Sequence, residues 1–257
     1  MITSTANAQV KNLAQLIKKS KVRTEQGVYV VEGVKMFQEA PRDEIVKAYI
    51  SEELYEKGTL KNCLEWIPYE VLKTEVFNHV ADTKTPQGVL CVMKQKKYTL
   101  DELTDGEAPL LLVLENLQDP GNLGTMMRTA EGAGVTGVLL SRGCVDIYNP
   151  KTIRSTMGSI YRVPFLYTDS LLEDMDKLHR KGITTYAAHL KGEGFYDEES
   201  YQGPTAFLIG NEGNGLSDEL SEKAKQYIKI PMEGKLESLN AAVAAAILMY
   251  EASRQRR

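Results

Sequence analysis

Five polar side chains between residues 122 and 240 are of the types that handle phosphate and hydroxyl groups. They stand in three blocks, Asn122 and Arg128 in ENLQDPGNLGTMMRTAEGAG (115–134), Glu212 in AFLIGNEGNGLSDE (206–219), and Ser238 and Asn240 in IKIPMEGKLESLNAAVAAAILMYE (228–251). Most neighbours of Arg128 are of usually buried types, so its guanidinium needs a carboxylate or phosphate partner. Asn122 taken alone is explained by a helix cap. Together the blocks indicate a ligand site.

The second and third blocks look like strand ends that bind a ligand. Each is an apolar run, then a loop rich in Gly, Asn, Glu and Ser, then a helix. In open α/β sheets, ligands bind at such strand ends. GAGVTG (132–137) is no dinucleotide fingerprint, because it follows a helix and precedes a strand, and we interpret it as a helix stop and turn. The loop GNEGNGLS (210–217) lacks the lysine of a P-loop.

Alternating strands and helices must position these blocks. Near-continuous apolar runs, typical of parallel strands covered on both faces, predict strands at 109–117, 137–141, 162–167, 183–190, 205–210 and 227–232. Helices are predicted from Asn122, from Ser170 to a stop at Gly182, and near the C-terminus. Upstream, an amphipathic helix carrying Val10, Leu13, Leu16 and Ile17 on one side precedes the strand-like runs VYVVEG, VKAYIS and GVLCVM. The fold class is therefore α/β, with a small unit before a larger parallel one.

The polar stretch KQKKYTLDELTDGEAP (94–109) predicts the boundary between the two parts. We expect a first domain at 1–97, a linker at 98–108 and a second domain at 109–257. Residues 1–97 carry 15 basic against 12 acidic side chains, whereas the whole chain has a net charge of −4. The first 24 residues contain no acid and a basic set suited to RNA phosphates, namely Lys11, Lys18, Lys19, Lys21 and Arg23. Charge alone is equally explained by a solvated helix face.

Composition excludes several classes of protein. The chain of 257 residues is 42% hydrophobic and 26% charged, which is the balance of a soluble globular protein. No apolar run approaches the roughly 20 residues that span a bilayer, and the N-terminus lacks the apolar core of a signal peptide, so we expect a cytoplasmic protein. The three cysteines and three histidines show neither a disulfide framework nor a metal-binding spacing.

The three blocks closely resemble the motifs of the SpoU, or TrmH, family of RNA 2′-O-ribose methyltransferases in the SPOUT superfamily. NLQDPGNLGTMMRTAEGAG, FLIGNEGNGLSDE and IPMEGKLESLNAAVAAAILMYE follow the order of the family's motifs. STANAQVKNLAQLIKK, VYVVEG and TKTPQGVLCV are similar to the ribosomal-protein-like RNA-binding domain that often precedes the catalytic one. The resemblance implies a deep trefoil knot in the parallel-sheet domain, and a homodimer whose interface adjoins the active site.

The resemblance also implies a cofactor and a set of site residues. The cofactor is S-adenosylmethionine (AdoMet), and its contacts carried over by position are Leu208, Gly210, Asn211, Ile230, Met232, Gly234 and Leu239. The catalytic positions fall on Asn122, Arg128, Glu212, Ser238 and Asn240. The family gives Arg128 a role in handling the proton of the ribose hydroxyl. A conservative role, holding the phosphate and the 2′-oxygen, suits a group that is normally always protonated.

The substrate and the reaction leave alternatives open at this stage. The extra N-terminal domain with its basic opening favours ribosomal RNA, and 23S rRNA first, over tRNA. A ribosome-associated RNA-binding protein without catalysis is a second hypothesis, against which the complete set of five polar residues weighs. Methylation of a base rather than a ribose is a third.

Overall fold

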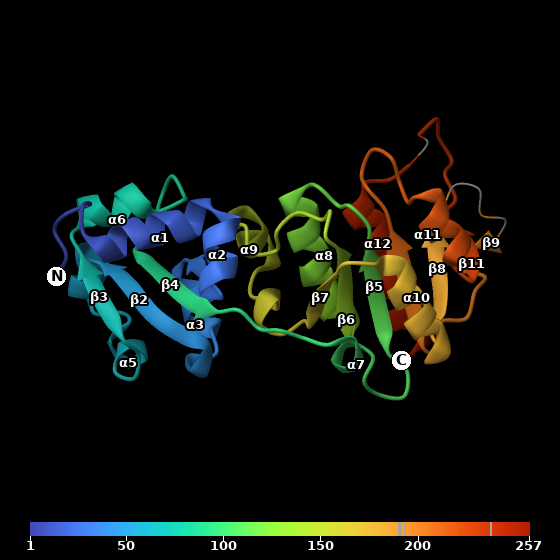
Figure 1. Ribbon diagram of the computed structural model, residues 1–257, viewed down its shortest axis with the longest axis horizontal. Helices are drawn as coiled ribbons and strands as arrows, with labels where there is room; N and C mark the ends of the chain where they lie inside the picture. Colours follow the sequence, from blue (N-terminus) through green and yellow to red (C-terminus); the bar gives the residue numbers. More distant parts are fainter. Residues whose placement is uncertain (190–191, 193, 237) are drawn as a thin grey trace. The chain divides into compact units, whose positions relative to one another are not determined.

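The chain folds into two compact units. The computed structural model describes residues 1–257 except 190, 191, 193 and 237. The first unit comprises Met1–Lys96 and Asp146–Tyr161, and the second comprises Lys97–Val145 and Arg162–Arg257. Figure 1 shows the elements of both. Residues 146–161, from the middle of the chain, thus pack with the N-terminal residues.

The first unit is built on a four-stranded sheet in the order β1-β4-β2-β3. Its elements are α1 (Ala8–Lys18), α2 (Ser20–Gln26), β1 (Val28–Glu32), α3 (Val34–Glu39), η1 (Arg42–Glu44), β2 (Ile45–Ser51), α4 (Glu52–Lys57), α5 (Lys61–Leu64), β3 (Tyr69–Leu72), α6 (Thr74–Val80), β4 (Val89–Lys94), α9 (Pro150–Thr156) and η2 (Ser159–Tyr161). Strand β4 is antiparallel to both neighbours, and β2 and β3 are parallel. The buried residues of α1 are the predicted ones, Val10, Leu13, Leu16 and Ile17. The amphipathic pattern is confirmed.

Long-range polar and aromatic contacts attach residues 146–161 to the rest of the first unit. Arg23 Nη2 lies 2.5 Å from Asp146 Oδ2, across 123 positions of sequence. The hydroxyl of Tyr161 donates to the carbonyl of Met36 at 2.9 Å. The rings of Tyr29 and Tyr148 have centroids 4.6 Å apart. These contacts make the segment an integral part of the unit.

The second unit is a parallel sheet with helices on both faces. Its elements are α7 (Leu100–Leu103), β5 (Leu110–Leu114), α8 (Pro120–Ala133), β6 (Gly137–Ser141), β7 (Phe165–Thr168), α10 (Leu171–Arg180), β8 (Thr184–Ala188), β9 (Gly194–Phe195), β10 (Thr205–Ile209), α11 (Asp218–Lys223), β11 (Gln226–Lys229) and α12 (Ala241–Gln255). The strand order among the described residues is β7-β6-β5-β10-β8-β11-β9, and every pair is parallel. The predicted α/β class is confirmed.

The two faces of this sheet have different coverings. Apolar side chains of α7, α10 and α11 pack with strand residues in one core cluster that includes Leu208. Helix α12 packs against α8 and against β10, and Figure 1 shows α8 and α12 close together. Consecutive residues of a strand point to opposite faces. Neighbouring residues of β10 therefore pack against different helices.

The predicted elements are found at their positions, with local differences. Gly134, with φ 78°, ends α8 and confirms the helix stop read from GAGVTG. The segment 98–108, expected to be a linker, contains α7, because Thr99 and Glu102 form a capping box and Leu103 is fully buried. Asn122 is not the cap of its helix, as its type had suggested, because Asp119 fills that position before Pro120. The strand predicted at 183–190 ends at Ala188, and Leu190 lies outside the described residues.

Candidate active site

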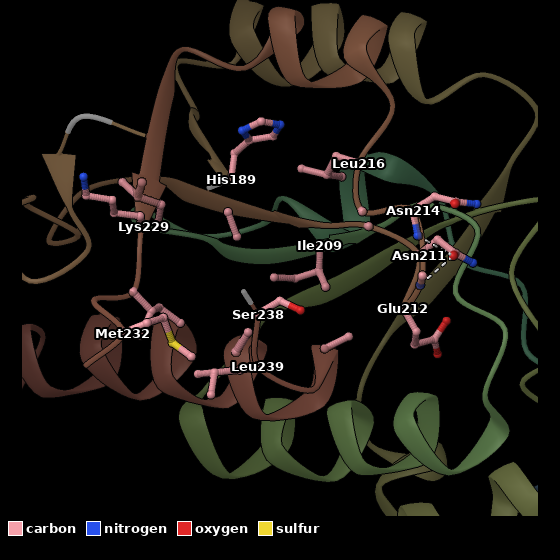
Figure 2. Close-up of a pocket in the computed structure, with 18 residues that line it drawn as sticks. His189, Ile209, Asn211, Glu212, Asn214, Leu216, Lys229, Met232, Ser238 and Leu239 are labelled. Carbon is pink, nitrogen blue, oxygen red and sulfur yellow. Dashed lines mark hydrogen bonds between the residues drawn. The ribbon is translucent and has the colours of Figure 1, made fainter. Parts of the chain in front are cut away.

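A cavity of about 330 Å³ lies at the carboxyl ends of the central strands of the second unit. Its walls come from the ends of β8 and β11, the loop after β10, and the start of α12 (Figure 2). The sequence-predicted site residues that line it are Gly210, Asn211, Glu212, Ile230, Met232, Ser238 and Leu239. The second and third sequence blocks, far apart in the chain, thus share one cavity.

The loop after β10 folds back on itself and forms one wall of the cavity. Asn211 and Gly215 exchange two backbone hydrogen bonds of 2.9 Å each. The side-chain oxygen of Asn211 accepts from the backbone of Gly213 and Asn214, and its amide nitrogen donates to the carbonyl of Asn116 at 2.8 Å. A Cβ on Gly210 would lie 2.0 Å from the carbonyl carbon of Gly215. Only glycine allows this close backbone approach.

A hydrogen-bonded chain joins all three sequence blocks beside the cavity. The amide nitrogen of Asn122 donates to Glu212 at 3.1 Å. The amide nitrogen of Asn240 donates to the side-chain oxygen of Asn122, also at 3.1 Å. The oxygen of Asn240 caps α12 by accepting from the backbone of Ala242 and Val243. Three of the five predicted catalytic residues therefore belong to one network.

The carboxylate of Glu212 is held in its ionised form. Partial burial raises its pKa, but hydrogen bonds from the backbone of Gln118 and Asp119 and from Asn122 outweigh the burial, so the pKa lies below the usual 4.5. The backbone bonds are 3.0 and 2.9 Å long. At neutral pH the group acts as an acceptor that ties the first block to the second.

Arg128 and Ser238 occupy different places around this network. Ser238 lines the cavity and is exposed to it (Figure 2). Arg128 lies on α8, is exposed, and within the described part of the chain neither pairs with a carboxylate nor donates a hydrogen bond. Of the two partners that the sequence left open, a carboxylate or a phosphate, the carboxylate is absent among these residues, and Glu212 already accepts from other donors. The guanidinium is available for an external anion.

Two predicted cofactor contacts lie away from the cavity lining that the structure describes. Leu208 is fully buried and packs with the α10 and α11 face of the sheet. Its neighbour Ile209 lines the cavity instead. Gly234 is exposed in the segment between β11 and α12, and a Cβ there would meet no atom within 4 Å. Leu208 is corrected to a core residue, because the alternation of β10 turns its side chain away from the cavity.

Several lining residues were missed by sequence reasoning. They are Ala188 and His189 at the end of β8, Ile228 and Lys229 in β11, and Ala241 and Ala244 at the start of α12. The end of β8 could have been found, because a third strand of the same parallel sheet ends at the same edge. The alanines carry no chemical signal, and their small side chains leave room for the cavity.

The predicted RNA-binding residues divide into two groups. Lys11, Lys18, Lys19 and Lys21 are exposed. Arg23 is only 4% exposed, and its guanidinium donates to the carbonyls of Leu16 and Ile17 and pairs with Asp146. Arg23 is therefore corrected from a surface phosphate ligand to a structural residue, because its positive charge is consumed within the first unit.

The cavity fits AdoMet in size and in chemistry. Small-molecule sites commonly enclose about 300–1,000 Å³ and mix an apolar lining with a few polar groups. Ile230, Met232 and Leu239 offer apolar contact to an adenosine group, and the tight turn at Gly210 brings backbone groups to the cavity surface. In the part of the chain that the structure describes, no cluster of His, Cys, Asp or Glu could hold a metal ion. No helix among the same residues is long and apolar enough to cross a membrane.

Comparison with known proteins gives consistent matches along the chain. The model of the SpoU rRNA Methylase family matches residues 109–250, and the model of the MRM3-like substrate binding domain matches residues 7–91. The chain is 35% identical over 253 residues to 23S rRNA (guanosine(2553)-2′-O)-methyltransferase RlmP of Bacillus subtilis (strain 168), covering 97% of both. It is 28% identical over 307 residues to human mitochondrial rRNA methyltransferase 3, covering 97% of this chain and 73% of that protein.

Solved structures agree in fold and in cofactor. The AdoMet-bound rRNA methyltransferase from Sinorhizobium meliloti is 30% identical with a TM-score of 0.87, covering 98% of this chain and 97% of that one. The SpoU methyltransferase AviRb from Streptomyces viridochromogenes in complex with AdoMet is 27% identical with a TM-score of 0.88, covering 97% and 98%. Fold, cavity and matches together define an AdoMet-dependent RNA methyltransferase with a SPOUT-type α/β domain. The chain belongs to the SpoU rRNA Methylase family.

Proposed function

We propose that the protein methylates a ribose 2′-hydroxyl of ribosomal RNA, and specifically of 23S rRNA. The observation that carries this proposal is the network Glu212–Asn122–Asn240, which joins the three blocks beside one cavity. The target named for the Bacillus subtilis relative supports 23S rRNA, and its guanosine is the first nucleotide to test. Because the substrate is ribosomal RNA, we also place the protein in the cytoplasm.

The residues around the cavity provide orientation more than proton transfer. AdoMet, when bound, supplies a methyl group activated by its sulfonium centre. Ser238 lies on the cavity wall and can hydrogen-bond a hydroxyl group that enters it. The amides of Asn122 and Asn240 fix the start of α8 against the cap of α12. Holding the ribose oxygen in line with the methyl group accounts for a large part of the catalysis required.

Arg128 would bind the RNA backbone. Its guanidinium is exposed, and no carboxylate of the described residues neutralises it. Arginine binds phosphate through two parallel hydrogen bonds, so it would fix the target nucleotide rather than act as a base. Arg128 does not belong to the described lining of the cavity. It would therefore act on the nucleotide from outside the cofactor pocket.

We further propose a homodimer and a knotted C-terminal segment, as the family resemblance implies. Val243 and Tyr250 on α12 are 48% and 46% exposed, although both are large apolar side chains. A second copy of the chain would cover them. Light scattering at micromolar concentration tests the dimer, and a monomer at all concentrations would refute it.

Exposed lysines of the first unit would contact RNA phosphates. Lys11, Lys18 and Lys19 lie on and just after α1, and Lys21 lies on α2. Phosphate contacts position a protein on RNA without reading its sequence. The first unit would thus contribute affinity for RNA, whereas the cavity and Arg128 would carry out methyl transfer.

Substitution of Arg128 tests the proposed function. Arg128→Ala should lower methyl transfer to 23S rRNA by at least about a thousandfold, whereas binding of AdoMet and the melting temperature stay near those of the wild type. Arg254→Ala is the matched control, because Arg254 is an exposed arginine of the same unit that pairs with Glu251. Normal turnover by the Arg128→Ala variant would refute the role of Arg128.

A further inference from the structure

Glu115 lies outside the cavity and makes two hydrogen bonds to Ser217, at the end of the loop that follows β10 (residues 210–217, here called the cofactor loop). It directly follows β5, and its backbone N–H donates to the carbonyl of Ile209 at 2.9 Å, which fixes its main chain to β10. Its carboxylate accepts from the backbone N–H of Ser217 and from the hydroxyl of Ser217, each at 2.7 Å. Neither Glu115 nor Ser217 belongs to the cavity lining in the described part of the chain.

Ser217 ends the cofactor loop and begins the next helix. Its hydroxyl oxygen accepts from the backbone N–H of Leu220 at 3.2 Å and so caps α11. The same hydroxyl donates its proton to Glu115. The preceding residue, Leu216, is 8% exposed and packs in the core. The loop end is thus attached to β5, to α11 and to the core.

The start of the loop is attached to the residue next to Glu115. Asn211 donates to the carbonyl of Asn116 at 2.8 Å. Asn116 has a φ of 53°, a left-handed conformation that non-glycine residues rarely adopt and that is often found at functional sites. Two consecutive residues after β5 therefore hold the two ends of a loop whose middle lines the cavity.

We propose that Glu115 is a positioning residue for AdoMet, acting through Ser217 on the loop at 210–216. This proposal rests on the assignment of the cavity as the cofactor site. The loop contributes seven residues in a row to the cavity lining, from Gly210 to Leu216. A carboxylate accepts both donors of Ser217 at once, and bonds to an ionised acceptor are about twice as strong as neutral ones. Without Glu115 the loop would sample open positions, and the binding of AdoMet would have to restore the closed one.

The inference predicts a selective loss of cofactor affinity. Glu115→Ala should raise the Kd and the KM for AdoMet by about tenfold, the equivalent of a lost charge-assisted hydrogen bond. The kcat at saturating AdoMet and the KM for RNA should stay within about twofold of the wild type, because closure is then restored by the cofactor. Glu115→Gln should have a smaller effect, because a glutamine can still accept one bond and donate another.

Variants of Ser217 test the same contact from its other side. Ser217→Ala removes the hydroxyl and should weaken AdoMet binding, whereas Ser217→Thr keeps the hydroxyl and should restore it. Ser170→Ala is the matched control, because Ser170 caps α10 in the same unit by accepting from Glu173 at 3.3 Å but does not touch the loop. Isothermal titration with AdoMet measures all of them. If Glu115→Ala fails to fold, the comparison of Ser217→Ala with Ser217→Thr decides.

The outcomes separate this inference from the cofactor assignment. A Glu115→Ala variant that binds AdoMet as tightly as the wild type would overturn the positioning role while leaving the cofactor site intact. An effect on kcat alone, or a loss no larger than that of Ser170→Ala, would overturn it as well. A wild-type protein that does not bind AdoMet would overturn the cofactor site and this inference together.

Discussion

The substitution Gly210→Ala tests the cavity at its tightest point. A Cβ at this position would lie 2.0 Å from the carbonyl carbon of Gly215, 2.1 Å from the nitrogen of Leu216 and 2.2 Å from the oxygen of Gly215. Carbon atoms pack at about 3.5–4 Å, so the two backbone segments must separate by roughly 1.5 Å. Both segments line the cavity. The shift would directly distort the cavity wall that the loop after β10 forms.

The expected magnitude follows from what opposes the shift. Overpacking costs about 1–3 kcal/mol, and the upper end applies because the clash is with backbone rather than with a flexible side chain. The paired backbone of Asn211 and Gly215 and the buried side chain of Leu216 hold the loop in place. We expect the second unit to lose about 3 kcal/mol of stability, a fall of about 6–12 °C in Tm. Affinity for AdoMet should fall by at least about a hundredfold.

Gly213→Ala is the control from the same loop. The nearest atom to a Cβ at Gly213 is the side-chain oxygen of Asn211 at 3.5 Å, an ordinary contact. Its effect on stability should stay within about 0.5 kcal/mol. Thermal melting compares the stability of the two variants, and calorimetric titration measures the affinity of Gly210→Ala for AdoMet against that of the wild type. Wild-type affinity in Gly210→Ala would refute the placement of the cofactor against this loop.

Three further predictions concern charge. The pKa of Glu212 lies below the usual 4.5, so the contribution of its carboxylate to stability is complete above pH 4.5 and is lost as the pH falls through the lower folded-state pKa. The difference in Tm between wild type and Glu212→Gln should therefore be constant from pH 7 to 4.5 and shrink below pH 4.5. A difference in Tm that changes near neutral pH would contradict the network. Arg23→Ala should destabilise the first unit by about 3 kcal/mol in denaturant titration, because it leaves Asp146 unpaired; an unchanged midpoint would contradict its structural role. Joint replacement of Lys18 and Lys19 by Ala should weaken RNA binding and leave AdoMet affinity unchanged. The slope of log K for RNA binding against the logarithm of the salt concentration should become smaller in magnitude by roughly 1.4. An unchanged slope would show that neither lysine contacts the RNA.

The sequence indicated that the second and third blocks meet at one edge of the sheet, and the cavity lies at that edge. Strands end and helices begin near Gly210, Glu212 and Asn240. In parallel sheets these boundaries are marked by residues that are neighbours in the sequence, so the sequence alone can indicate them. The apolar runs also gave the strands, since buried parallel strands have no polar alternation to confuse the pattern. The same lack of alternation explains the error at Leu208. When both faces are buried, composition cannot say which side chain turns toward the cavity.

Contacts between distant segments could not be predicted in the same way. Arg23 looked like one member of a basic surface, and its partner Asp146 lies 123 residues away with no motif to mark it. The sequence did not single out Glu115, which lies inside the run predicted as a strand at 109–117, and only the fold brings Ser217 to it. The segment 94–109 contains many charges, so its composition indicated a linker, but one buried leucine and a capping box make part of it a helix. In each case tertiary contacts decided the outcome.

Analysis of the methylated RNA product tests the proposed function most directly. The wild-type protein is incubated with AdoMet carrying a tritium-labelled methyl group and with total RNA from a strain that lacks the protein. The 23S rRNA and the tRNA are then separated and hydrolysed in alkali. A ribose 2′-O-methyl group blocks cleavage at its own phosphodiester, so we predict that the label appears in 23S rRNA as an alkali-resistant dinucleotide. Label in alkali-labile mononucleotides would indicate a methylated base, and label in tRNA alone would exclude the proposed substrate. Either result would contradict the proposal.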